Sequence, residues 1–234
     1  MALKACTINV NGFRKKHRPP LLFYTMEERG IDVIFLQETH ITNPREAKNC
    51  ARLWKGRHFW SFGTNRARGC GILLAKDLDY TFVAQQHDSD GRLVVVDIDM
   101  NGHQYRLINV YAPNNPAERR IFLNRLEVYL AVGRDCVIGG DWNFVEDVNL
   151  DRQGISTYVG DAGKKEMKSL RDDFFLIDAF RARQPNCKKF SFRTGASSGR
   201  LDRWYVADHM RPWLDSVTYE PCPWSDHYYV FFDF

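Results

Sequence analysis

The sequence predicts an α/β fold in which two mostly antiparallel β-sheets pack together and are flanked by helices. Short apolar runs typical of strands dominate the 234 residues, and only a few helix-like segments lie between them. Neighbouring runs are also close enough along the chain to pair as hairpins. No long stretch is rich in proline, glycine or serine, so we expect no linker and a single domain over residues 1–234.

The N-terminal elements have clear boundaries. Residues 3–10 are predicted to form a strand that ends at an Asn-Gly pair. Residues 19–29 suit a helix, with proline in its first turn and Gly30 as its stop. Residues 31–38 are a continuous apolar run that ends in polar residues, which predicts a central strand buried on both faces.

The middle and C-terminal parts alternate strands with two more helices. Asn101 and Gly102 predict a tight hairpin turn between two of the strands. The segments 7–11 (TINVN) and 107–111 (LINVY) resemble each other, which suggests an internal duplication. Strands are expected at residues 58–63, 70–75, 80–86, 92–100, 105–113, 136–141 and in four later pieces that end with 227–234, and helices at 116–132 and 163–173.

Bulk composition allows a nucleic-acid partner and sets the expected environment. The net charge of +4 permits such a partner without demonstrating one. The densest basic run, residues 14–18 (RKKHR), can be a solvated loop or a phosphate contact. The six cysteines form no C-x-x-C pair, which favours a reducing, intracellular setting. No signal peptide and no apolar run near the ~18 residues of a membrane helix is present, so we expect no membrane association.

Polar side chains collect where the buried-looking strands begin or end. One such terminus would be an ordinary turn, but several in one domain predict a polar site at one rim of the sheets, where loops carry function on a rigid scaffold. The residues concerned are Asn9, Asn11, Glu38, His40, Tyr111, Asn114, Asp141, Asn143, Asp202, Asp226 and His227.

The stretch VIGGDWN, residues 137–143, allows two interpretations. In one, Gly-Gly-Asp is a turn that Asp141 caps. In the other, Gly139 and Gly140 let a phosphate approach the end of the strand, and Asp141 and Asn143 contact it. The other strand ends favour the second interpretation.

The chemistry of this set suits a hard divalent cation and a phosphate. Magnesium is held by one or two carboxylates together with water and phosphate oxygens, and a free carboxylate can accept a proton from water. Zinc would require several histidines or cysteines, which the set lacks. Ser225 lies beside Asp226 and His227, but adjacent residues of an extended chain point to opposite faces, so they do not form a catalytic triad.

Six motifs in order carry a resemblance to a known family. They are TINVNG, LQETH, NVYAPN, GGDWN, GRLDRWYV and SDH, and they span nearly the whole chain. The sequence resembles the endonuclease/exonuclease/phosphatase superfamily, and more closely the apurinic-type endonuclease domain of non-LTR (LINE-type) retrotransposons. The resemblance implies a four-layered α/β sandwich, phosphodiester hydrolysis and dependence on Mg²⁺, for which Mn²⁺ can substitute.

The resemblance also implies a role for each matching residue. Glu38 is expected to be the main metal ligand, with Asn9 and Asn11 beside it and Asp226 next to the metal and phosphate. Asp141 is expected to orient or deprotonate the attacking water.

Five further residues match positions that act on the phosphate. Asn143, Asn114 and Tyr111 are expected to hold the scissile phosphate. His227 is expected to stabilise the charge that develops on it, and Asp202 to orient the histidine ring from behind.

Other positions are expected to contact DNA. Ser191 matches a small hydroxyl near the DNA backbone in relatives. The segment from Arg193 to Arg200 matches a hairpin that probes the minor groove, although a glycine-serine loop without a role is the alternative. Arg152, with Lys164 and Lys165, is expected to contact the duplex.

Departures from the family pattern narrow the function. Asn11 stands where abasic-site repair enzymes usually carry an acid, and Tyr228 follows the SDH motif where those enzymes tend to have proline. The expected function is therefore nicking of double-stranded DNA, in the nucleus, which leaves a 3′-hydroxyl to prime reverse transcription. A reverse transcriptase domain is expected to follow Phe234 in a longer polyprotein. The alternatives are an abasic-site repair endonuclease, an enzyme for a phosphoester head group, and a non-catalytic nucleic-acid-binding module.

Overall fold

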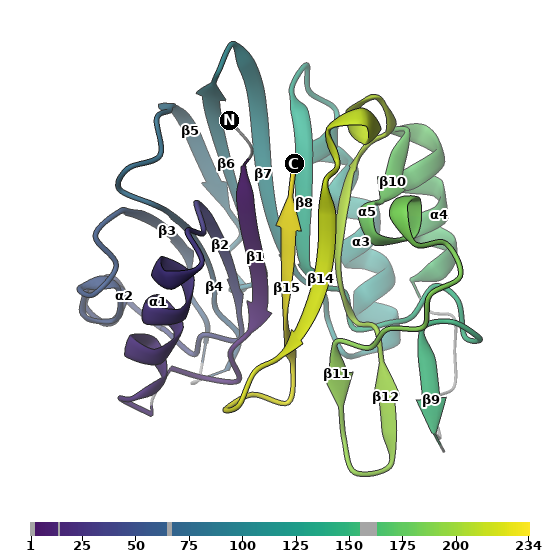
Figure 1. Cartoon of the computed structure of the whole chain (residues 1–234), viewed down its shortest axis with the longest axis horizontal. Coiled ribbons are helices and arrows are strands. Elements are labelled where there is room, and N and C mark those ends of the chain that lie inside the picture. Colours follow the sequence, from purple (N-terminus) through teal and green to yellow (C-terminus); the bar gives the residue numbers. More distant parts are fainter. Residues whose placement is uncertain (1–2, 14, 65–66, 155–162) are drawn as a thin grey trace.

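The computed structural model describes residues 3–13, 15–64, 67–154 and 163–234, and two six-stranded sheets form its centre (Figure 1). The first sheet contains β1 (Lys4–Asn9), β2 (Val33–Gln37), β3 (Arg57–Ser61), β4 (Cys70–Leu74), β14 (Ser216–Pro221) and β15 (Tyr228–Asp233). The second contains β5 (Thr81–His87), β6 (Leu93–Met100), β7 (His103–Tyr111), β8 (Asp135–Asp141), β10 (Leu176–Asp178) and β13 (Asp202–Ala207).

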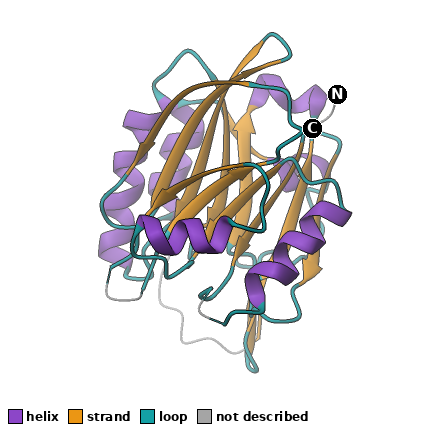
Figure 2. Cartoon of the chain, turned by 90° about the vertical axis from the view of Figure 1, so that its left-hand side faces the viewer, coloured by secondary structure: helices purple, strands orange, loops and turns teal. Residues whose placement is uncertain are grey.

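Helices cover the outer faces of both sheets (Figure 2). They are α1 (Arg18–Glu28), α2 (Pro44–Ala51), α3 (Pro116–Leu130) and α4 (Lys164–Asp173), whereas α5 (Ala179–Arg183) and the 3₁₀ helix η1 (Asp208–Trp213) contribute residues to the core between the sheets. One hydrophobic cluster lies between the sheets, a second joins the first sheet to α1 and α2, and a third joins the second sheet to α3 and α4. This arrangement confirms the predicted four-layered α/β sandwich.

Both sheets have the same strand arrangement. The strand order is β14-β15-β1-β2-β4-β3 in the first sheet and β5-β6-β7-β8-β13-β10 in the second. In each sheet the central pair is the only parallel pair among the described strands. This pair is β1 with β2 in the first sheet and β7 with β8 in the second. The sheets are therefore mostly antiparallel, as predicted. The similar segments 7–11 and 107–111 run through the equivalent strands β1 and β7, which agrees with an internal duplication.

Local signals explain the long helices. The side chain of Asn115 caps α3 by accepting hydrogen bonds from the backbone N–H groups of Ala117 and Glu118, and Pro116 occupies the first turn. Helix α1 has proline at its start and is followed by Gly30 with φ of +61°. The short helix α2 is not among the predicted elements, because its buried face consists of Ala47 and Ala51 alone and gives little apolar periodicity.

The strand ends that carry polar residues meet at one edge of the sandwich. The parallel pairs place the carboxyl ends of β1, β2, β7 and β8 at this edge, and β13 and β15 begin there. A three-stranded sheet of β9 (Arg152–Gly154), β11 (Phe192–Arg193) and β12 (Ser197–Gly199) projects from the same edge, at the bottom of Figure 1.

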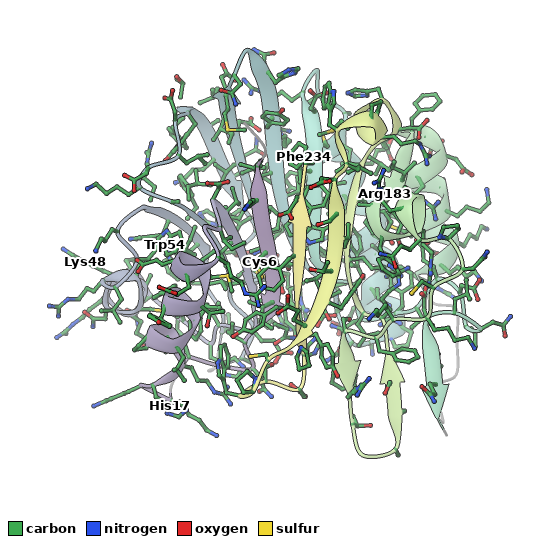
Figure 3. All side chains as sticks on the ribbon, in the orientation of Figure 1. Cys6, His17, Lys48, Trp54, Arg183 and Phe234 are labelled. Atoms are coloured by element: carbon green, nitrogen blue, oxygen red, sulfur yellow. The ribbon has the colours of Figure 1, made fainter. Side chains whose placement is uncertain are left out.

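Leu3, the first described residue, and Phe234 lie together at the opposite edge. The backbone N–H of Leu3 donates to the carbonyl of Phe234 at 2.6 Å, and the N–H of Phe234 donates back at 3.1 Å. Figure 3 shows Phe234 near the upper edge, whereas His17, just before α1, lies near the lower edge. The edge with the polar residues is therefore separated from both ends of the chain.

Two further features are the state of the cysteines and the length and apolar character of the helices. All six cysteines are free thiols. Within the described residues, no helix combines the length and the apolar character that a membrane span requires.

The role predicted for the two glycines of VIGGDWN is wrong. A Cβ atom on Gly139 would lie 2.4 Å from the ring of Trp204, and one on Gly140 would lie 1.9 Å from the carbonyl oxygen of Val110. Both glycines therefore make room for the protein's own side chain and backbone, and not for a phosphate. Gly140 also has φ of +144°, which L side chains rarely adopt.

We expect Gly140→Ala to lower the free energy of unfolding by about 2 kcal/mol or more, because the new methyl group clashes with the rigid backbone of β7. Gly133→Ala is the matched control, since a Cβ there meets nothing within 4 Å, and its effect should stay below about 0.5 kcal/mol. Urea unfolding of both variants measures the difference. Equal midpoints for the two variants would contradict the packing argument.

Candidate active site

A histidine between two carboxylates forms the centre of the polar edge. Nδ1 of His227 lies 2.8 Å from Oδ2 of Asp202, and Nε2 lies 3.9 Å from Oδ2 of Asp141. Asp141 ends β8 and Asp202 begins the neighbouring strand β13, where the two are directly paired in register. All three residues are buried, with His227 5% exposed.

The three groups change one another's proton affinity. Burial lowers the pKa of His227, but the carboxylates of Asp202 and Asp141 outweigh burial and raise the pKa to about 10. Burial, and then repulsion by Asp202, raise the pKa of Asp141 to about 7, against the opposing effects of His227 and Asn9. The ring is therefore a cation at neutral pH, and Asp141 can take up a proton close to neutral pH.

Hydrogen bonds from both sheets hold Asp141 in place. Nδ2 of Asn9, at the end of β1, donates to Oδ2 of Asp141 at 3.0 Å. The backbone N–H of Asn143 donates to Oδ1 at 3.0 Å. The side-chain amide of Asn143 donates to the carbonyl of Ala112 at 2.8 Å and so joins the loop after β8 to the loop after β7.

A second pair joins the sheets through Glu38 and Tyr111. The hydroxyl of Tyr111 donates to the carboxylate of Glu38. Burial and the charge of Glu38 raise the pKa of Tyr111, so the hydroxyl keeps its proton. Arg92 lies over the ring of Tyr111 at 5.0 Å and donates to its carbonyl at 3.2 Å.

A third group of hydrogen bonds ties the β1 loop to the segment before β15. Nδ2 of Asn11 donates to Oδ1 of Asp226 at 3.2 Å, and the N–H of Asn11 donates to Oδ1 of Asn9 at 3.0 Å. The hydroxyl of Ser225 donates to the carbonyl of Asn9 at 2.8 Å and accepts the N–H of His227 at 3.2 Å. Ser225 therefore bonds to backbone groups on both sides, in keeping with the expectation that it is not a nucleophile.

These residues surround a pocket of about 530 Å³. Its floor carries the carboxylates and the histidine, and one wall is formed by the projecting three-stranded sheet. Among the predicted site residues, those that line it are Glu38, Asn114, Asp141, Asn143, Arg152, Asp226 and His227. Asn9, Asn11, Tyr111 and Asp202 hydrogen-bond directly to members of that group.

Two predicted DNA contacts lie behind the pocket wall. Ser191 is fully buried, and its hydroxyl accepts the backbone N–H groups of Leu201 and Asp202 at 2.9 and 2.8 Å. Arg200 is also buried, and its guanidinium pairs with Asp151 at 2.7 Å and with Asp178 at 2.6 Å. In this conformation both residues support the start of β13, and neither has a surface that DNA could reach.

Arg193, another predicted DNA contact, is exposed on β11. Its guanidinium lies 5.3 Å from the centre of the Tyr228 ring. The turn between β11 and β12 is closed by Thr194, whose N–H donates to the carbonyl of Ser197 at 2.9 Å. The segment therefore forms a hairpin that projects beside the pocket.

Two sets of residues have the chemistry to hold a cation. Asp141, Asp202 and His227 offer ligand atoms within 4.8 Å of one another. However, the Nδ1 atom of His227 is already engaged with Asp202, so this set offers fewer free ligand atoms than its three residues suggest. Glu38 and Asp226, which both line the pocket, are the better match, because hard oxygen donors suit Mg²⁺.

A buried polar network beneath the site is absent from the sequence predictions. Nε2 of Gln37 donates to Thr7 at 2.9 Å and to Asn109 at 2.7 Å, and Nδ2 of Asn109 donates to the carbonyls of Leu36 and Gly71. These residues link β2 to β7 across the interface between the sheets. The available signal was a polar residue within or directly after a mostly apolar run in each of three strands, namely Thr7, Gln37 and Asn109.

Comparison with known proteins gives a family and a relative. Residues 6–227 match the Endonuclease/Exonuclease/phosphatase family. The chain is 32% identical over 234 residues to the Transposon TX1 uncharacterized 149 kDa protein of Xenopus laevis. That alignment covers 97% of this chain and 18% of the transposon protein, so the chain spans less than a fifth of that relative.

Solved structures of the same fold include three AP endonucleases. The enzyme LMAP from Leishmania major superposes with a TM-score of 0.80 at 19% identity, over 99% of this chain and 87% of that one. The APE2 catalytic domain of Xenopus laevis gives 0.82 at 19%, over 98% and 91%. An enzyme from Archaeoglobus fulgidus gives 0.79 at 20%, over 98% of both chains.

We expect Asp202→Asn to lower the pKa of His227 from about 10 toward its ordinary value of 6.5, because the closest opposing charge is removed. In the unchanged protein the ion pair stabilises the fold fully below about pH 6.5, and this contribution is lost as the pH rises through 10. NMR titration of the His227 ring measures the shift.

Asp208→Asn is the matched control for this titration, because Asp208 is exposed and pairs with Arg211 at the far end of β13. It should leave the titration of His227 unchanged. A His227 ring that loses its proton near pH 6.5 in the unchanged protein would contradict the charged arrangement.

Proposed function

The chain belongs to the endonuclease/exonuclease/phosphatase family, and we propose that it is a magnesium-dependent endonuclease that nicks double-stranded DNA. One observation carries the proposal. A cationic histidine and a buried carboxylate of raised pKa face the same pocket as the oxygen donors of Glu38 and Asp226. This combination provides a proton acceptor, a fixed positive charge and a cation site at one phosphate.

Asp141 is proposed to act on the attacking water. Its two oxygens are fixed by Asn9 and Asn143, so the carboxylate cannot rotate away from the pocket. Its raised pKa makes it a stronger base than an ordinary aspartate, as a general base at neutral pH requires.

His227 is proposed to stabilise the charge that develops on the phosphate. Its ring is already positive and is held by Asp202 on the side away from the pocket, so no reorganisation is needed when the charge appears. A bound Mg²⁺ at Glu38 would polarise the phosphate and stabilise the leaving oxygen.

Neighbouring groups are proposed to hold the DNA. Asn114, Asn143 and Arg152 line the pocket and are placed to hold the phosphate. The hydroxyl of Tyr111 is committed to Glu38, so its proposed part is to orient that carboxylate next to the phosphate.

We propose that the nick leaves a 3′-hydroxyl that primes reverse transcription in the nucleus. The similarity to a transposon protein supports this role, because the chain matches only a small part of that large protein. A reverse transcriptase is accordingly the proposed partner, joined to this domain in a longer polyprotein.

We expect Asp141→Asn and His227→Gln each to reduce the rate of nicking of supercoiled plasmid at least about 100-fold, because each removes one charge-dependent step. EDTA should abolish nicking, and Mg²⁺ or Mn²⁺ should restore it. The conversion of closed plasmid to open circles on a gel is the measurement.

Asp215→Asn and His87→Gln are the matched controls, since both residues are exposed and lie outside the pocket. They should nick at the unchanged rate. Cleavage of abasic DNA or of a phosphoester head group, with intact plasmid, would redirect the proposal within the family. Binding of DNA without cleavage of any of these substrates would make the chain a binding module.

We expect replacement of residues 194–197 by Gly-Gly to change the positions of the nicks, because the projecting hairpin would no longer reach the minor groove. Arg200 stays in place, since its ion pairs are structural. Sequencing of the nicked ends gives the pattern, and Gly-Gly at the distant Asn101–Gly102 turn is the control. An unchanged pattern would remove the hairpin from site selection.

A further inference from the structure

Two buried arginines occupy matching places in the two halves of the fold. Arg18 begins α1, the helix that connects β1 to β2, and Arg119 lies in the first turn of α3, the helix that connects β7 to β8. Arg18 is 8% exposed and Arg119 is 1% exposed. Each arginine therefore lies near the start of the helix that joins the central parallel strand pair of its sheet.

Each guanidinium turns back under the loop that precedes its own helix. Nη1 of Arg18 donates to the carbonyls of Val10, Asn11 and Gly12 at 2.9, 2.5 and 3.0 Å. Of the basic run 14–18, residue 14 lies outside the described residues, and Arg18 is neither solvated nor placed for a phosphate. A flat ring also supports it, since the guanidinium lies 5.6 Å from the centre of the Trp224 ring.

Arg119 repeats this arrangement in the second half. Its Nη1 donates to the carbonyls of Pro113 and Asn114 at 2.9 and 3.0 Å, and its guanidinium lies 5.8 Å from the ring of Phe144. Again a buried cation gathers consecutive carbonyl groups of a strand-end loop and packs against an aromatic ring.

The loops that the two arginines hold carry residues of the pocket. Asn11 and Gly12 have φ of +44° and +85°, and this left-handed turn directs their carbonyls toward Arg18 while the amide of Asn11 reaches Asp226. Asn114 lines the pocket directly. Without a buried donor, several carbonyl groups of each loop would lack a partner, and the loop would have to move to satisfy them.

We propose that Arg18 and Arg119 are paired positioning residues, Arg18 for the cation side of the pocket and Arg119 for the phosphate side. The assignment of the two sides rests on the proposed function, whereas the holding of the loops does not. Both side chains are buried, and the Nη1 atom of each is engaged by its own loop, although Arg119 also lines the pocket next to Asn114. We therefore expect each arginine to act through the loop that it holds.

The first test uses plasmid nicking to distinguish an effect on the cation side of the pocket from an effect on the phosphate side. Arg18→Met should raise the Mg²⁺ concentration for half-maximal rate at least about tenfold and leave the DNA concentration for half-maximal rate within about twofold. Arg119→Met should show the reverse. Arg29→Met, at the exposed end of α1, and Arg120→Met, beside Arg119 on the surface of α3, are the matched controls and should change neither value.

A general loss of stability would move both concentrations together in each variant, and that result would overturn the proposal, as would no change in either. Where a methionine variant does not fold, Arg18→Lys and Arg119→Lys retain a donor. The lysine variants should show the same difference between the Mg²⁺ and DNA concentrations for half-maximal rate, but a smaller one. An equal change in both concentrations would again overturn the proposal.

The second test does not depend on activity. Hydrogen–deuterium exchange should increase at the amides of residues 9–13 alone in Arg18→Met, and at the amides of residues 112, 114 and 115 alone in Arg119→Met. If the unchanged protein nicks no DNA, the proposed function fails, while this local exchange pattern still supports the holding of the loops. Unchanged exchange, or an increase throughout the chain, would overturn the proposal that the two arginines hold these loops.

Discussion

The rest of the site depends on the burial of a charged histidine between two carboxylates. A buried charge is tolerated only when its partners are close and well oriented, since removing either partner leaves an unpaired charge in the interior. The chain meets this requirement by placing Asp141 and Asp202 opposite each other on paired strands and bringing His227 in from the other sheet. Ser191 fixes the backbone of Asp202, and Asn9 fixes the carboxylate of Asp141. The charged histidine can therefore be buried only because the two sheets pack face to face, since its partners come from the other sheet.

The charge pattern of the pocket also relates the cation to the DNA. Glu38, Asp226 and Asp141 place negative charge where a phosphate is proposed to bind, and His227 offsets only part of it. A phosphate is repelled by such a site until a cation neutralises it, and the phosphate in turn adds oxygen ligands to the cation. On the proposed function, metal and DNA should therefore strengthen each other's binding. Arg152 stands at the rim, where it can attract the backbone before the phosphate reaches the centre.

Much of the fold and the membership of the site could be predicted from the sequence, because both depend on local patterns. Apolar runs and caps located the long helices and most strands, and polar residues at strand ends located the pocket. Roles that depend on distant neighbours could not be predicted. The space beside Gly139 is occupied by the ring of Trp204, and the ion pair with Asp178 keeps Arg200 in the interior. Buried Arg18 looked like part of a basic surface run, because sequence alone does not show which way a side chain turns.

The pairing of Leu3 with Phe234 has a consequence for how the fold can be rebuilt. Ends that already exchange two hydrogen bonds can be joined by a short linker, and new ends can then be opened at an exposed turn such as Asn101–Gly102. The pocket would be untouched, because its residues lie where β7 and β8 end, whereas the Asn101–Gly102 turn precedes the start of β7. In such a circular permutant the strands would keep their positions in space but follow one another along the chain in a different order. The two halves of the sandwich could then be synthesised in either order.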